Sequence, residues 1–149
     1  MRYDIATCSF QEFTPDMGIP VPISVGLPNE YKGKQVTTIC KGLRPFGVFN
    51  VYEQEFEYGV HYQDRMEKQA AHISADLKRI QNENNGQALV LMCWCNLHKK
   101  TNWCHRRMAA AWIEERTGLT VPELGRVQPT NLYPSWMEDK QPPEQAPLF

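Results

Sequence analysis

The chain has 149 residues, of which 42% are hydrophobic and 22% are charged, and its formal net charge is -1. This length suits one domain with its own core. The charge gives no indication of a general polyanion-binding domain, which would be strongly basic, and leaves room for a local basic patch. No apolar run is long enough to span a membrane and the first residues lack a signal-peptide pattern, so we expect a cytoplasmic protein with no membrane partner.

The first part of the chain is predicted to be mostly extended. Arg2 to Cys8 alternates as a strand does. Ile19 to Val25 is rich in β-branched residues but contains two prolines, Pro20 and Pro22, which predicts an edge strand or an extended loop. Val36 to Cys40 is a further short strand candidate.

A helix is predicted from Gln63 to Gln81, followed by a buried strand. Apolar residues recur at steps of four and three along the helix, which gives one buried stripe: Met66, Ala70, Ile73, Leu77 and Ile80. After the turn signal Asn84-Asn85-Gly86, the run from Gln87 to Cys93 is continuously apolar, as expected for a central strand buried on both faces.

A second helix is predicted from Trp103 to Thr117. Thr101 and Asn102 are good N-cap residues, and Gly118 stands where a terminating glycine belongs. The order helix, buried strand, helix predicts an α/β domain with a partly parallel sheet. We place this single domain at residues 1–127 and a proline-rich C-terminal extension and tail at residues 128–149.

Cysteine and histidine are concentrated in the loop between that strand and that helix. Ligands of open α/β sheets bind at the carboxyl ends of strands, where Cys93 lies. Cys104 and His105 would open the helix, where the dipole favours a thiolate or a bound anion. In a thiol-enzyme hypothesis, Cys104 or Cys93 is the nucleophile and His105 carries protons. Arg106 or Arg107 would grip an anion.

The same loop supports a zinc hypothesis. Five residues with suitable ligand atoms lie within it, more than a structural zinc site needs: Cys93, Cys95, His98, Cys104 and His105. The Cys-x-Cys spacing is less typical of zinc than Cys-x-x-Cys. A third interpretation gives the loop no function, with Cys93 a small core residue, His105 a packing residue and the arginines a solvated face.

These residues also resemble a known family. Cys104-His105-Arg106-Arg107, followed by Glu114 to Gly118 and by Val121-Pro122-Glu123-Leu124, looks like the bacterial and phage family called domain of unknown function 488. Ile5 to Phe10, the segment from Val21 to Pro28, and Leu43-Arg44-Pro45 fall in the order of one of its branches. The resemblance implies a Rossmann-like α/β fold with Cys93, Cys104, His105 and Arg106 as the site, and it supplies no substrate. Many relatives have glutamate where this chain has Cys95, which favours metal binding in this member.

Two features suggest a role near DNA. The last residues, Gln145-Ala146-Pro147-Leu148-Phe149, look like the short peptide by which bacterial replication and repair proteins dock on the sliding clamp. Gln145, Leu148 and Phe149 would make the contacts, unless the tail folds back over its own domain. Trp94 and Trp103 flank the cysteine loop and are candidates to line a pocket that holds a nucleobase.

We therefore expect a small cytoplasmic enzyme that acts on an anionic, nucleotide- or nucleic-acid-related substrate. Cys93, Cys104 and His105 would be catalytic, and Arg106, Arg107, Trp94 and Trp103 would bind the substrate. The alternative is a non-catalytic module, stabilised by zinc at the same loop, that binds nucleic acid or a replication protein.

Overall fold

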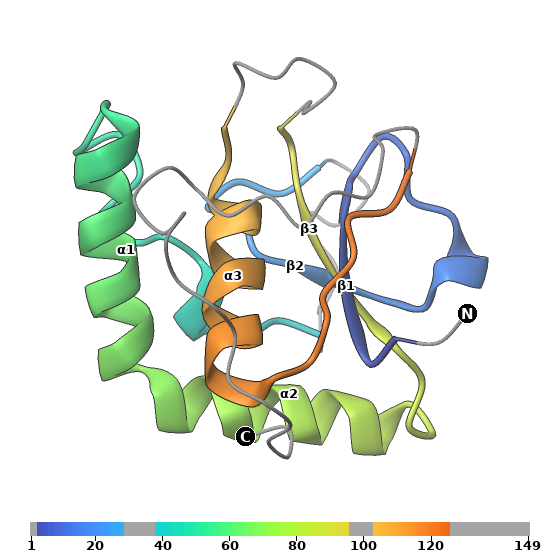
Figure 1. Ribbon diagram of the computed structural model, residues 1–149. Coiled ribbons are helices and arrows are strands. Elements are labelled where there is room, and N and C mark those ends of the chain that lie inside the picture. The colour runs from blue at the N-terminus through green and yellow to red at the C-terminus, as the bar shows by residue number, and fades with distance from the viewer. Residues whose placement is uncertain (1–2, 29–37, 96–102, 126–149) are drawn as a thin grey trace.

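Three parallel strands form the sheet at the centre of the protein (Figure 1). The computed structural model describes residues 3–28, 38–95 and 103–125. The strands are β1 (Ile5–Ser9), β2 (Ile19–Pro22) and β3 (Leu89–Cys93), in the spatial order β1-β3-β2. The predicted central strand is confirmed, because β3 pairs on both sides and all five of its residues are buried. The proline-containing β2 lies at the edge, as its two prolines predicted.

In the described part of the chain, three helices accompany the sheet: α1 (Glu55–Lys68), α2 (Ala70–Glu83) and α3 (His105–Thr117). The connections described there also contain two short 3-10 turns, η1 (Pro15–Met17) and η3 (Lys41–Leu43). The prediction of one helix from Gln63 to Gln81 is wrong, because the chain turns at Gln69 and α2 leaves at a steep angle to α1 (Figure 1). The apolar stripe stays in phase across that turn, so its residues are buried although they belong to two helices.

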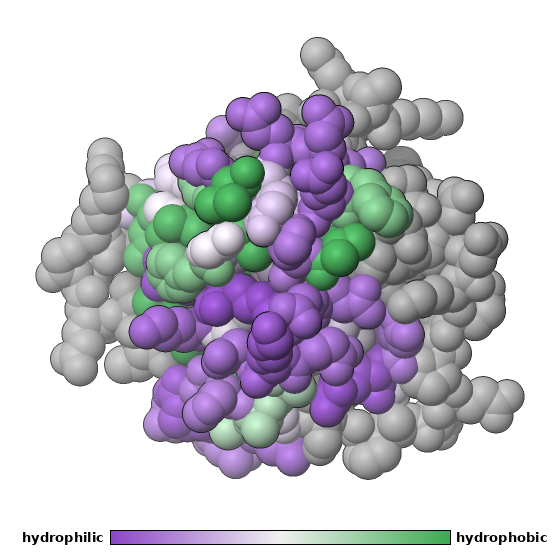
Figure 2. All heavy atoms as spheres, turned by 90° about the vertical axis from the view of Figure 1, so that its left-hand side faces the viewer, coloured by the Kyte–Doolittle hydropathy of each residue, from purple (hydrophilic) through white to green (hydrophobic). Residues whose placement is uncertain are grey.

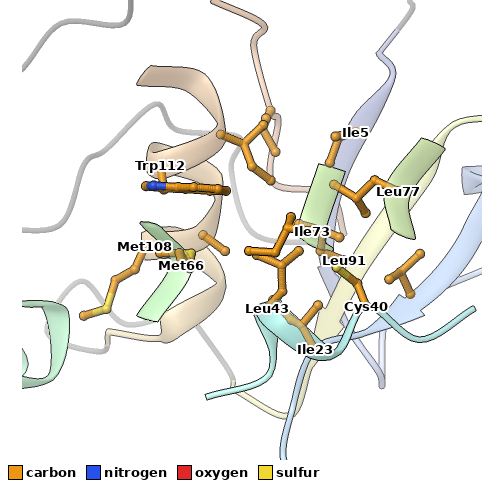
Figure 3. Close-up of a cluster of buried hydrophobic side chains, with 14 of the residues drawn as sticks. Ile5, Ile23, Cys40, Leu43, Met66, Ile73, Leu77, Leu91, Met108 and Trp112 are labelled. Atoms are coloured by element: carbon orange, nitrogen blue, oxygen red, sulfur yellow. The ribbon is translucent and has the colours of Figure 1, made fainter. Parts of the chain in front are cut away.

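The helices supply the core on one face of the sheet. Leu89 and Leu91 of β3 and Ile5 of β1 join this core. Figure 3 shows its side chains meeting between α3, α2 and the strands: Trp112 and Met108, Ile73 and Leu77, Leu43, and Ile5 with Leu91. Because strand residues alternate, Cys93 has the same parity as Leu89 and Leu91 and so points to the side where the helices lie.

A smaller hydrophobic cluster covers the opposite face of the sheet. Val90 and Met92 of β3 and Cys8 of β1 are buried there beneath Phe10, Phe13, Met17 and Leu124. These covering residues come from the connection after β1 and from the segment after α3. In the parts of the chain that the structure describes, all three α-helices therefore pack on one face, so the α/β class is confirmed at the level of helices on a small parallel sheet.

The segment after α3 returns to the sheet. The amide of Thr7 donates to the carbonyl of Pro122 at 2.9 Å, and the amide of Leu124 donates to the carbonyl of Thr7 at 2.7 Å. Thr7 and Glu123 form a parallel bridge at the outer side of β1. This pairing brings Glu123 back beside the start of α3.

Apolar side chains are exposed near α1. Five large ones lie between residues 46 and 60: Phe46, Phe49, Val51, Phe56 and Val60. Figure 2, which faces α1, shows apolar groups in the upper half of this surface above a largely hydrophilic lower half. None of the described helices is long and apolar enough to cross a membrane.

His98, Thr101, Asn102, Gln145, Leu148 and Phe149 lie outside the described residues, so their predicted roles stay predictions. Of the strand candidate at Val36 to Cys40, only residues 38–40 are described, and they form no strand.

Candidate functional site

The end of β3 and the start of α3 bring two thiols into contact. Cys93 is the last residue of β3, and Cys104 is the N-cap residue of α3. Their Sγ atoms are 2.9 Å apart, and both side chains are buried. The predicted N-cap at Thr101 or Asn102 is wrong, because the backbone of Cys104 is still extended (φ -156, ψ 149) and the helix begins only at His105.

His105, the first residue of α3, is oriented by a backbone carbonyl. Its Nε2 lies 3.0 Å from the carbonyl oxygen of Ile23, just beyond β2. A carbonyl can only accept, so Nε2 carries the proton and Nδ1 keeps a free lone pair. Nδ1 lies 3.6 Å from Cys104 Sγ. The imidazole is thus fixed in the tautomer that can accept a proton from Cys104 or donate its lone pair to a metal.

Arg106 lies fully buried beside these thiols. Its Nη1 donates to the carbonyl oxygen of Cys95 at 2.7 Å and to Cys93 Sγ at 3.3 Å. Its Nε and Nη2 are also buried, and neither has a hydrogen-bond partner among the residues that the structure describes. A buried guanidinium with two unused donors is costly unless a negative group meets it.

The surroundings favour the thiolate form at Cys93 over that at Cys95 or Cys104. Burial by itself would raise the pKa of Cys93, but hydrogen bonds from Cys104 and Cys95, with the positive charge of Arg106, hold that pKa well below its usual value. Burial and the neighbouring Cys93 thiolate raise the pKa of Cys104 well above its usual value. Burial lowers the pKa of His105, so the imidazole is neutral. The thiolate form of Cys93 would balance the positive charge of Arg106.

Cys95 completes the group of thiols. Its side chain is half-buried and packs against Cys93 and Cys104. The hydrogen bond with Cys104 lowers the pKa of Cys95, but the interaction with the Cys93 thiolate and burial outweigh it and raise that pKa to about 12. Cys95 is therefore a neutral thiol that can donate to Cys93.

This cluster could hold a metal ion. The ligand atoms of Cys93, Cys104 and His105 all lie within 4.8 Å of one another, and Cys95 is adjacent. The sulfur and imidazole donor set suits a soft or borderline cation. The Nε2 hydrogen bond to Ile23 is the outer contact that fixes a metal-binding imidazole.

Arg107 is placed differently from Arg106. Its Nε and Nη2 make two parallel hydrogen bonds to the carboxylate of Glu123, at 2.7 and 2.9 Å. The exposed fraction of the side chain is 16% for Arg107 and 4% for Glu123. Glu123 therefore occupies the Arg107 guanidinium group, which the sequence analysis assigned to an anionic substrate.

The two tryptophans predicted to line a pocket contact different parts of the protein. Trp94 is 48% exposed, meets Phe10 edge to face, and donates from Nε1 to the carbonyl of Gly26 at 3.0 Å. Trp103 is partly buried and packs on Tyr58 of α1, with ring centroids 5.1 Å apart. Trp94 alone presents a large open surface.

Several contacts of the site could not be predicted from the sequence. The carbonyls of Ile23 and Cys95 are backbone groups without a residue-type signal. Tyr62 of α1, which meets the His105 ring edge to face at 5.7 Å, reads in the sequence as an ordinary core residue. Glu123 was visible as part of a motif, but its pairing with Arg107 depends on the return of the chain to β1.

Comparison with protein-family models, with curated proteins and with solved structures finds no match to this chain. The feature that points to a function is therefore the geometry of the cluster formed by Cys93, Cys95, Cys104, His105 and Arg106.

Proposed function

We propose that the protein is a small enzyme in which Cys93 is the nucleophilic thiolate and Arg106 binds an anionic, nucleotide- or nucleic-acid-related substrate. One observation carries this proposal. Arg106 is fully buried next to the Cys93 sulfur, while its Nε and Nη2 have no partner among the described residues. An anionic group of a substrate would satisfy both donors, and a guanidinium favours phosphate and carboxylate groups because they accept two parallel hydrogen bonds.

The other side chains fit roles around this pair. Cys104 donates to the Cys93 thiolate, and His105 Nδ1 is placed to take or return the Cys104 proton. The start of α3 adds the favourable end of the helix dipole for an anion. Trp94, exposed beside the strand end, offers a surface on which a base could stack.

The proposal is tested by binding of inorganic phosphate and a deoxynucleoside monophosphate, measured by calorimetry. Losing hydrogen bonds to a charged group costs about 1.5–3 kcal/mol, so Arg106→Gln should weaken binding by about tenfold or more. The matched control is Arg116→Gln on the same helix, a residue whose side chain is 43% exposed and which should leave binding unchanged. Circular dichroism checks that Arg106→Gln folds. Wild-type protein that binds neither probe, or equal binding by folded Arg106→Gln, overturns the anion role.

Zinc bound by Cys93, Cys95, Cys104 and His105 is the second candidate, because the ligand atoms of Cys93, Cys104 and His105 lie within 4.8 Å of one another and Cys95 is adjacent. Three thiolates and a neutral imidazole around Zn²⁺ carry one negative charge, which the adjacent Arg106 would balance. Two zinc-bound sulfurs in a tetrahedron lie about 3.8 Å apart, given bonds of about 2.3 Å. Cys93 and Cys104, whose Sγ atoms are 2.9 Å apart, would therefore separate by about 0.9 Å on binding zinc.

In the zinc alternative, the protein is a non-catalytic module that binds nucleic acid or a replication protein. Elemental analysis of protein purified without chelator separates the two candidates. A zinc content near one per chain, lost in Cys104→Ser, supports the metal centre. A content near zero ends it.

Family membership and the Rossmann-like fold stay proposals of the same kind. The Cys-His-Arg motif at the start of α3 and the strand-end Cys93 support the domain of unknown function 488 family. The parallel sheet with its site at the carboxyl edge supports a reduced Rossmann-like arrangement.

A further inference from the structure

Cys93 and Cys104 have the geometry of a reactive thiol pair. Their Sγ atoms are 2.9 Å apart, while a disulfide bond measures about 2.05 Å, so bond formation needs a further approach of about 0.9 Å. All five cysteines are free thiols, but the other buried ones lie elsewhere: Cys8 packs under the opposite face of the sheet and Cys40 lies in the helical core.

We infer that Cys93 and Cys104 are a reversible dithiol–disulfide pair that hydrogen peroxide oxidises. Peroxide is the oxidant that suits this position, because both sulfurs are buried and a small neutral molecule reaches them more readily than a bulky disulfide does. The inference goes beyond the proposed enzyme activity and does not depend on an anionic substrate.

The surrounding groups supply what each step needs. Cys93 sulfur attacks one peroxide oxygen, the O–O bond breaks, and the products are Cys93 sulfenic acid and hydroxide. The Arg106 guanidinium, 3.3 Å from Cys93 Sγ, provides positive charge where the leaving oxygen becomes negative. Peroxide is reduced by two electrons, which come from the Cys93 sulfur.

The second step closes the disulfide. Cys104 gives its proton to His105 Nδ1, 3.6 Å away, and its sulfur attacks the Cys93 sulfenic sulfur. The S–O bond breaks, and the departing hydroxide takes up the proton as water. A cellular or added dithiol reverses the reaction by thiol–disulfide exchange and restores both thiols.

Disulfide formation and metal binding exclude each other at this site, because a metal needs the thiolates that the disulfide consumes. A protein that holds metal here would therefore resist peroxide until the metal is removed. The site could in this way link the redox state of its surroundings to the packing of α3 against β3.

The test treats reduced, full-length protein with hydrogen peroxide, alkylates the remaining thiols after denaturation, and counts them by mass spectrometry. We expect the loss of two of the five thiols, their recovery with dithiothreitol, and a cross-link between the peptides that contain Cys93 and Cys104. Cys95→Ser should still form this cross-link, which assigns the bond, and Cys93→Ser should not form it. Cys104→Ser should instead accumulate Cys93 sulfenic acid, trapped by a dimedone probe.

Two results overturn the inference. One is wild-type protein, free of metal by elemental analysis, that keeps all five thiols under conditions that oxidise free cysteine. The other is a cross-link through Cys95 in place of Cys93 or Cys104. The wild-type cross-link map decides the matter even if a serine variant fails to fold. Phosphate binding measured on the reduced protein is independent of this outcome, so failure of the disulfide and failure of the proposed function are distinguishable.

Discussion

The Arg107–Glu123 pair provides the sharpest test of the different roles of the two neighbouring arginines, of which Arg107 would stabilise the fold and Arg106 would bind an anion. The pair is bidentate and nearly buried, and it ties the start of α3 to the segment that returns along β1. Removing one partner of a buried pair costs about 3–5 kcal/mol, because the other charge stays buried without compensation. Glu123 is the more buried of the two, so Arg107→Met should cost more than Glu123→Gln.

The expected loss can be placed on a temperature scale. For a chain of about this size, 1 kcal/mol corresponds to about 2–4 °C in melting temperature, so Arg107→Met at about 3 kcal/mol should melt about 6–12 °C lower. Thermal unfolding followed by circular dichroism measures this shift. The double variant Arg107→Met/Glu123→Met leaves no buried charge and should lose less than the sum of the single losses.

The same variant also separates structure from binding. Arg107→Met should leave phosphate affinity close to wild type at temperatures where it is folded, because its guanidinium is already used by Glu123. A melting temperature within 2 °C of wild type (about 1 kcal/mol or less), or strictly additive single losses, would refute the argument from burial. A stable Arg107→Met variant that no longer binds phosphate would make Arg107, and not Arg106, the anion ligand.

Three further outcomes are expected. The ultraviolet absorbance of one thiolate should persist in the metal-free folded protein below the ordinary pKa of cysteine, should vanish in Cys93→Ser, and should shift to higher pH in Arg106→Gln. Burial raises the pKa of Glu114 above 4.5, so its contribution to stability is present below that value and is lost as the pH rises through the raised pKa. Glu114→Gln should therefore melt higher than wild type at neutral pH, and the gap should close on acidification. Deleting Gln145 to Phe149 should abolish binding to a bacterial sliding clamp and barely change the melting temperature.

Each of these has a result that contradicts it. Thiolate absorbance that persists in Cys93→Ser would show that the thiolate is Cys95 or Cys104 and not Cys93. A Glu114→Gln variant that melts lower at neutral pH would mean that the hydrogen bond from the Val121 amide to the carboxylate outweighs the cost of burying the charge. A tail deletion that lowers the melting temperature by several degrees, with no clamp binding by the isolated peptide, would make the tail a cover for its own domain.

The elements that the sequence predicted well are those with a local signature. The apolar run before Cys93 marks a doubly buried strand, and Gly118, which adopts a left-handed conformation (φ 76), marks the end of α3. Pro20 and Pro22 placed β2 at the edge. The turn at Gln69 escaped prediction because nothing in the residue types interrupts the helical pattern there, and the stripe from Met66 to Ala70 continues across it.

The site divides in the same way. That Cys93 and Cys104 would approach each other followed from a strand end and a helix start, which are local features. The different environments of Arg106 and Arg107 could not be predicted from local features, because side chains at adjacent helix positions point about 100° apart. Which of the two arginines faces the thiols depends on how α3 is rotated about its own axis relative to the sheet. Arg107 pairs with Glu123 because the chain after α3 returns to β1. This is a tertiary contact that residue spacing does not encode.

The prolines of β2 also bear on how the protein behaves at high concentration. The backbone amide of Ile19 donates to the carbonyl of Ala88, just before β3, and the amide of Ile23 donates to the carbonyl of Met92 in β3. The alternate residues, Pro20 and Pro22, therefore stand where a strand would present its N–H groups outward, and proline has none. At the other edge, the segment at Pro122 to Leu124 already occupies the outward groups of Thr7. Among the described residues, Pro20, Pro22 and Thr7 therefore offer no outward N–H group to a strand from another molecule, which disfavours edge-to-edge aggregation.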